Sequence, residues 1–132
     1  MLMHAGGIVR TLRSYTICYI IASVGVALKR IVWHGDSLER IRSFPSDARQ
    51  DAGFELERVQ RNLEPRDWRP MNAAGAGVVE IRVHAGSEYR VFYVAKWKDA
   101  VHVLHAFVKK TQKTRRADIE LAARRYREAK EE

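Results

Sequence analysis

The sequence predicts a small α+β domain, in which an N-terminal helical hairpin packs on a small antiparallel sheet and a C-terminal helix follows. Apolar residues recur every three or four positions between about residues 37 and 63, and from residue 79 they alternate with polar residues. The helical spacing returns after residue 114. The chain has 132 residues, of which 46% are hydrophobic, which suits one domain with a core of its own.

A short strand and a short helix open the domain. Residues 30–33 are a strand candidate. Asp36 or Ser37 can cap a helix over residues 37–44, and Pro45 ends it.

A longer helix and a loop follow. Ser46 is expected to cap a helix that runs to about Leu63, with charged residues on the side opposite to its apolar stripe. The two helices are expected to form an antiparallel hairpin. Two prolines and the small residues 73–77 then predict a loop that contains Trp68.

Three antiparallel strands joined by short turns are predicted next, over residues 79–84, 89–95 and 101–108. The first has an apolar and an ionic face. The last is apolar on both faces and is expected to be central or covered on both sides. The lysines that follow it are costly to bury, so its end should lie at the domain surface. Thr114 is expected to cap the last helix.

Residues 1–29 form an apolar and basic extension to a domain that spans residues 30–132. An uncharged run of 14 residues, 15–28, is shorter than the roughly 20 needed to cross a bilayer. A secretory signal peptide, a membrane-lying anchor and an extension from a start codon placed too far upstream all remain open. Cys18 is the only cysteine and is expected to be a buried, inert thiol in a protein of a reducing compartment.

Positive charge is concentrated in one part of the chain. The formal net charge is +8, and residues 80–116 hold nine bases and three acids, a local excess of +6. This patch suggests a nucleic-acid partner, with an anionic membrane, an acidic protein or a merely solvated face as alternatives. No cluster of cysteine and histidine has metal-ligand spacing, so no metal or other cofactor is expected.

Several segments resemble one family in order and spacing: IVWHGDSLERIRSFP, VVEIR, YRVFYVA and VLHAFVKKTQKT. They resemble the phage-derived, HigB-type branch of the RelE/ParE toxin superfamily over about residues 30–130. The resemblance implies a RelE-like α+β toxin of the cytoplasm, paired with a helix-turn-helix antitoxin. It also implies cleavage of mRNA in the decoding site of the ribosome, without a metal or small-molecule cofactor and without a membrane partner.

The resemblance points to Arg82 and Arg90 as catalytic candidates, since they match the arginines of the family's E-x-R and Y-R strands. A guanidinium group donates two hydrogen bonds to a phosphate and stays charged when partly buried. Arg82 could instead be a structural partner of Glu80 or Glu88.

Lys109, Lys110 and His105 complete the catalytic candidates. Lys109 is favoured over Lys110 because it shares strand parity with His105. The lysines could instead be solvated, and a histidine in an apolar strand is more often a hydrogen-bonded core residue. The candidate RNA-binding residues are Lys96, Lys98, Lys113, Arg115 and Arg116.

Two other functions remain open on this sequence. The chain could be a ParE-like inhibitor of DNA gyrase, or an inactive module that only binds its antitoxin. The ribosome-dependent endoribonuclease is favoured because HAFVKKTQKT is typical of the HigB-type branch. The sequence offers no evident strong base, so catalysis is expected to depend on positioning and charge, with negligible activity on free RNA.

Overall fold

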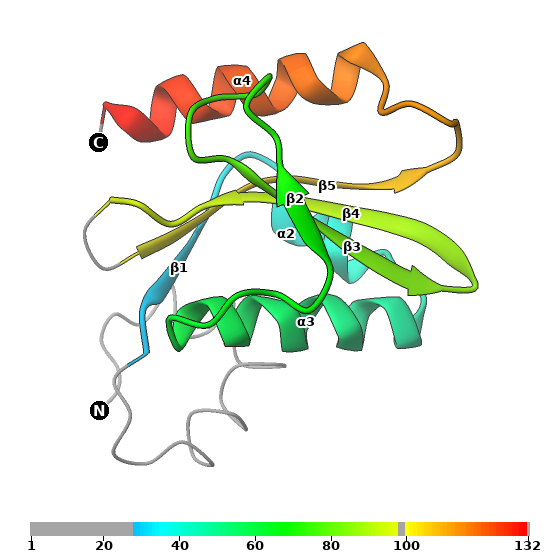
Figure 1. Ribbon diagram of the computed structural model, residues 1–132. Helices are drawn as coiled ribbons and strands as arrows, with labels where there is room; N and C mark the ends of the chain where they lie inside the picture. Colours follow the sequence, from blue (N-terminus) through cyan, green and yellow to red (C-terminus); the bar gives the residue numbers. More distant parts are fainter. Residues whose placement is uncertain (1–27, 98–99, 132) are drawn as a thin grey trace.

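The computed structural model describes residues 28–97 and 100–131 and has the predicted α+β architecture (Figure 1). Its elements in chain order are β1 (Arg30–Trp33), α2 (Ser37–Arg42), α3 (Ser46–Gln60), β2 (Trp68–Pro70), β3 (Val79–Ala85), β4 (Ser87–Val94), β5 (Ala100–Lys109) and α4 (Arg116–Lys130). The five strands form one mixed sheet in the order β1-β5-β4-β3-β2. The arrangement is compatible with a RelE-like fold.

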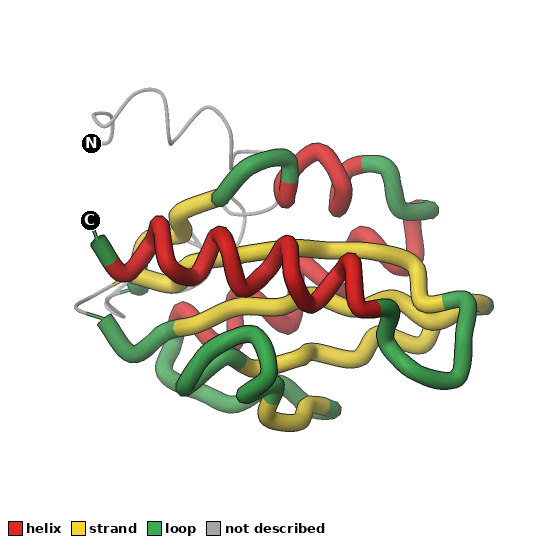
Figure 2. The backbone as a smooth tube through the Cα atoms, turned by 90° about the horizontal axis from the view of Figure 1, so that it is seen from above, coloured by secondary structure: helices red, strands yellow, loops and turns green. Residues whose placement is uncertain are grey.

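Helices cover both faces of the sheet. Figures 1 and 2 show α3 on one side and α4 lying across the other, and α2 packs with α3 in the same apolar core. That core joins Phe44 and Leu56 to Val91 of β4. A second core, under α4, joins Phe92 and Leu104 to Ala122 and other apolar residues. The sheet is therefore the middle layer of three.

The predicted meander of three antiparallel strands is confirmed as β3, β4 and β5. Its last strand is central, as predicted, because β5 lies between β4 and β1 and is buried from Ala100 to Phe107. Burial stops at Val108, which is 38% exposed, so the boundary between apolar and cationic residues lies at the surface as expected.

The predicted antiparallel pairing holds from β2 to β5, whereas β1 adds a parallel edge strand. This strand pairs with β5 in parallel, with Arg30 opposite Ala100 and Trp33 opposite Val103. Alternation along a strand indicates which residues share a face, but it does not identify the neighbouring strand. The pairing therefore could not be read from residues 30–33.

The predicted loop around Trp68 contains a short strand, β2. Trp68 lies opposite Ile81 and Pro70 opposite Val79, so β2 is the edge of the sheet beside β3. The proline suggested a loop because it has no N–H to donate to a neighbouring strand. At the edge of a sheet that group is not needed.

The helix ends differ from the predicted ones by a few residues. The long helix α3 ends at Gln60, because Asn62 has a left-handed φ of 67° and Leu63 is 48% exposed, outside the buried stripe. The short helix α2 ends at Arg42, although Phe44 still packs in the core.

Asp36, one of the two residues predicted to cap α2, holds the cap position, but none of the predicted side chains makes a capping hydrogen bond. Ser37 and Ser46 are the first helical residues, and the Ser37 hydroxyl instead donates to the carbonyl of Val103 in β5 (3.2 Å). Arg115 holds the cap position of α4, while the Thr114 hydroxyl points to Glu80 Oε2 (3.5 Å). For Ser37 and Thr114, tertiary hydrogen bonds have replaced the local ones that capping rules assume.

The hypotheses on the N-terminal extension, with Cys18, concern residues that lie almost wholly outside the described part of the chain. In residues 28–97 and 100–131, none of the helices combines the length and apolar character needed to cross a membrane.

Candidate functional site

The predicted cations of the three meander strands share one face of the sheet. Arg82 lies directly opposite Arg90, Arg90 opposite Phe107, and Glu88 opposite Lys109. Directly opposed residues of antiparallel strands point to the same side. Because Phe107 belongs to the core under α4, the face of Arg82, Arg90 and Lys109 is the one that α4 covers.

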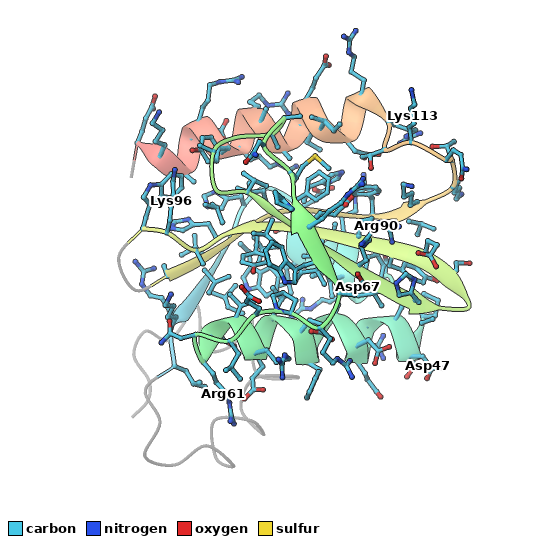
Figure 3. All side chains as sticks on the ribbon, viewed as in Figure 1. Asp47, Arg61, Asp67, Arg90, Lys96 and Lys113 are labelled. Carbon is cyan, nitrogen blue, oxygen red and sulfur yellow. The ribbon has the colours of Figure 1, made fainter. Side chains whose placement is uncertain are left out.

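Arg90, labelled in Figure 3, is buried and engaged by two carboxylates. Its Nη1 donates to Glu88 Oε1 and to the carbonyl of Tyr89, each at 3.0 Å. Its Nε lies 3.7 Å from Oε2 of the fully buried Glu80, which also accepts a hydrogen bond from Arg69 Nε (2.6 Å). Only 6% of Arg90 is exposed, and its guanidinium is engaged by Glu80 and Glu88.

Arg82 is paired with Asp67, not with Glu80 or Glu88. Its Nε donates to Asp67 Oδ1 (3.1 Å) and its backbone N–H to the Asp67 carbonyl (2.9 Å). The Arg82 side chain is 34% exposed. Arg82 is therefore more accessible than Arg90 but shares its charge with a carboxylate.

His84 connects the carboxylate partner of Arg82 to a carboxylate partner of Arg90. Its Nε2 lies 2.6 Å from Asp67 Oδ2 and its Nδ1 lies 2.8 Å from Glu88 Oε2. The hydrogen bond to Glu88, followed by the one to Asp67, raises the pKa of His84. The same hydrogen bonds lower the pKa of both carboxyl groups. Ion pairs thus run from Arg82 to Arg90 along the β3–β4 hairpin.

The end of β5 and the start of α4 enclose a pocket of about 260 Å³. Its lining residues are Arg40, Phe107, Val108, Lys109, Lys110, Thr111, Arg115 and Asp118. Half of them are cationic, and they come from α2, from the end of β5 and from the residue before α4. The charge of the pocket therefore suits an anion.

The pocket has a buried histidine behind its wall. His105 has no exposed surface, and its Nε2 lies 2.8 Å from Oδ1 of Asp118. The other carboxylate oxygen of Asp118 accepts a hydrogen bond from Arg115 Nε (3.3 Å). Burial lowers the pKa of His105, and the Asp118 hydrogen bond opposes this shift only in part.

A family model described as Phage derived protein Gp49-like (DUF891) matches residues 39–127, which are 89 of the 132 residues. The chain belongs to the Gp49-like family. This family is associated with RelE-like toxins. The matched residues of the Gp49-like chain run from α2 to α4 and include every residue that lines the pocket. No curated protein shows significant similarity to the chain.

Among the predicted RNA-binding residues of this Gp49-like chain, three lie near the pocket and one lies far from it. Lys113, Arg115 and Arg116 follow β5, and Arg116 is 89% exposed beside Glu120. Lys96 lies at the opposite end of the molecule from Lys113 (Figure 3). Its ammonium group lies over the rings of Trp97 and Tyr126. Lys98 is outside the described residues.

Two residues of the pocket, Arg40 and Asp118, were not among the predicted site residues. Arg40 lies on the outer side of a short helix, and no local pattern marks it. Asp118 did carry a signal: it precedes Ala122 and Tyr126 at spacings of four, so it is an acid at the head of the buried stripe of α4. Within the described ranges, no group of three or more potential metal ligands is present.

Proposed function

We propose that the protein is the HigB-type toxin of a type II toxin–antitoxin pair and acts as a metal-independent endoribonuclease on mRNA bound to the ribosome. The observation that carries the proposal is the cationic pocket at the end of β5, in a chain of a family associated with RelE-like toxins. The segment that bears the pocket lysines is HAFVKKTQKT, on which the HigB resemblance depends.

The pocket suits cleavage of RNA by its own 2′-hydroxyl. In that reaction the hydroxyl attacks the neighbouring phosphate and charge accumulates on the phosphoryl oxygens, so fixed cations stabilise the transition state. Lys109, Lys110 and Arg115 supply such charge, and Arg40 adds more from α2. Arg90 acts indirectly: it donates a hydrogen bond to Glu88, and Glu88 lies opposite Lys109 in the sheet.

The surrounding bases would hold the RNA backbone without reading its sequence. Lys113 and Arg116 are exposed on the loop and helix start beside the pocket. Contacts of this kind fix orientation and give affinity, while the ribosome supplies the geometry of the mRNA. A toxin of this kind acts in the cytoplasm, and its helix-turn-helix antitoxin would neutralise it by covering the cationic pocket with acidic side chains.

Mapping mRNA 5′ ends after a brief induction tests the proposal. The wild-type chain should create new ends within translated reading frames, and a Lys109→Ala, Lys110→Ala double variant should create few. Lys130→Ala is the matched control, since Lys130 is an exposed lysine at the far end of α4. Purified protein should leave free mRNA intact.

Other outcomes of that experiment exclude the nuclease. Intact mRNA together with a DNA-damage response would identify a gyrase inhibitor on the same scaffold. Intact mRNA with normal growth would identify a module that only binds its antitoxin.

A further inference from the structure

We propose that Asp118 is the general base of the pocket and that His105 is a positioning residue that orients its carboxylate. The inference rests on the proposed ribonuclease and names the residue that takes up the proton of the attacking hydroxyl. A role for Asp118 does not follow from charge alone, because the rest of the pocket is arranged to attract an anion.

Asp118 is the one acid among the described residues that line the pocket. Four cations surround the same space, so a substrate phosphate held by them brings its ribose close to the carboxylate. Asp118 is itself 94% buried, with 6% of its surface exposed, which limits its contact with competing water. A carboxylate in a phosphate pocket repels the substrate phosphate in the ground state, so we infer that Asp118 contributes in the reaction.

Both carboxylate oxygens are held but neither is saturated. Oδ1 accepts from His105 Nε2 at 2.8 Å and Oδ2 accepts from Arg115 Nε at 3.3 Å. Each oxygen of an ionised carboxylate can accept about two hydrogen bonds. One site on each therefore remains for a ribose hydroxyl.

The environment of His105 suits a positioning role. Its ring stacks on Phe107 at 5.1 Å between centroids and meets the edge of Phe92 at 6.5 Å. Its Nδ1 is buried and has no hydrogen-bond partner within the described part of the chain. With Nε2 donating to Asp118 and Nδ1 without a proton, the imidazole is neutral and its orientation is set by that one hydrogen bond.

Leaving a buried ring nitrogen without a hydrogen-bond partner costs free energy. An apolar side chain would fill the same core position without that cost. The histidine is therefore better explained by its N–H group, which fixes Asp118, than by packing.

The reaction step balances with groups of the pocket alone. The 2′-hydroxyl proton passes to the Asp118 carboxylate while the bond between O2′ and phosphorus forms. The bond between phosphorus and O5′ breaks, and O5′ takes a proton from the ammonium group of Lys109 or Lys110, which both line the pocket. The products are a 2′,3′-cyclic phosphate and a 5′-hydroxyl, and solvent returns the proton from Asp118 to the lysine.

The test is single-turnover cleavage of mRNA on ribosomes by purified variants. Asp118→Asn should lower the cleavage rate by about 100-fold or more, the usual contribution of a general base. Asp118→Glu keeps a carboxylate and should cleave at least about 10-fold faster than Asp118→Asn. Glu120→Gln, an exposed acid on the same helix, should cleave like the wild type.

The outcomes separate this inference from the proposed function. If the wild type cleaves and Asp118→Asn matches it, Asp118 is not the base, while the ribonuclease proposal stands. If the wild type itself does not cleave, the proposed function fails. Thermal unfolding of each variant shows whether a lost rate reflects lost folding. If Asp118→Asn and Asp118→Glu have the same melting temperature and the same low rate, the carboxylate is not the base.

The test of His105 requires a measurement that distinguishes its hydrogen bond to Asp118 from its packing in the core. His105→Gln retains an N–H donor and should keep most of the cleavage rate, whereas His105→Leu should lose as much as Asp118→Asn. Equal rates for the two His105 variants, at their measured melting temperatures, would remove the positioning role.

Discussion

Arg90 shows how far the character of a single residue can be predicted from its strand. Alternation places Arg90 on the face opposite to Tyr89 and Val91, and the register of β3 with β4 puts Arg82 on the same face as Arg90. Alternation does not say what covers that face. Phe107 lies opposite Arg90, and Glu80 and Glu88 take up its charge, so a residue predicted to contact phosphate is enclosed in the protein.

Replacing Arg90 with alanine should destabilise the fold. Removing one member of a buried ion pair leaves Glu80 with less compensation, so we expect the free energy of unfolding to fall by about 3 kcal/mol. Arg116→Ala removes an arginine that is 89% exposed and should change it by less than about 0.5 kcal/mol. Denaturant titrations of the two variants make the comparison, and equal stabilities would contradict the structural role of Arg90.

The pKa of His84 predicts a dependence of stability on pH. The raised pKa means that the folded chain binds this proton more tightly than the unfolded chain. The stabilisation is complete below the ordinary histidine pKa of about 6.5 and is lost as the pH rises through the raised value. Because Asp67 and Glu88 must be ionised, it also requires a pH above about 4 to 4.5.

Chemical denaturation between about pH 6 and about pH 8.5 should show this loss in the wild type and less of it in His84→Asn. His84 is about half exposed, so solvent limits the effect to under about 1 kcal/mol. Identical pH profiles for the two proteins would show that His84 gains nothing from its two carboxylates.

At the scale of elements, the predictions succeeded where the hydrophobic pattern was long and regular. β5 is apolar at almost every position, so its central place followed from composition. β2 has three residues and ends in a proline, and only its pairing with β3 makes it a strand. The pocket likewise depends on α2, β5 and α4 meeting, which no pattern within one element reports.

The loop before β3 holds α4 in place at Gly75, and this can be tested. Gly75 has a φ of +155°, and a β-carbon there would lie 2.6 Å from the ring of Tyr126. Gly75→Ala should therefore lower the free energy of unfolding by about 2–3 kcal/mol, from strain and overpacking together.

Gly86→Ala provides the matched control for that prediction. Gly86 also has a positive φ, of +83°, but a β-carbon there meets no atom within 4 Å. Its cost should be the backbone strain alone, about 1 kcal/mol. Thermal melts of both variants separate the two effects, and an equal loss would show that Gly75 is not constrained by α4.

At the scale of the whole molecule, the net charge of +8 is less informative than its placement. Lys96 and Lys113 were predicted to contact the same RNA, yet they lie at opposite ends of the sheet (Figure 3). Charge counted along a sequence does not distinguish one end of a strand hairpin from the other.

The salt dependence of RNA binding should show which end of the molecule contacts RNA. A lysine that contacts a phosphate contributes about 0.7 to the slope of log affinity against log salt for single strands. Lys110→Ala should reduce the slope by about that amount, whereas Lys96→Ala should leave it nearly unchanged. Fluorescence titrations of a short single-stranded RNA at several salt concentrations measure both, and equal reductions would place RNA along the whole sheet.

The parallel pairing of β1 with β5 also determines when the pocket can form. Arg30 has no neighbouring strand until Ala100 has been synthesised, because β1 pairs only with β5. The pocket likewise requires both Arg40 and Asp118. Contacts over such separations form late in folding, because a long loop must close first. During synthesis the early segments leave the ribosome long before their partners exist. For the proposed toxin, we therefore expect that the nascent chain does not act on its own ribosome until the final helix has emerged.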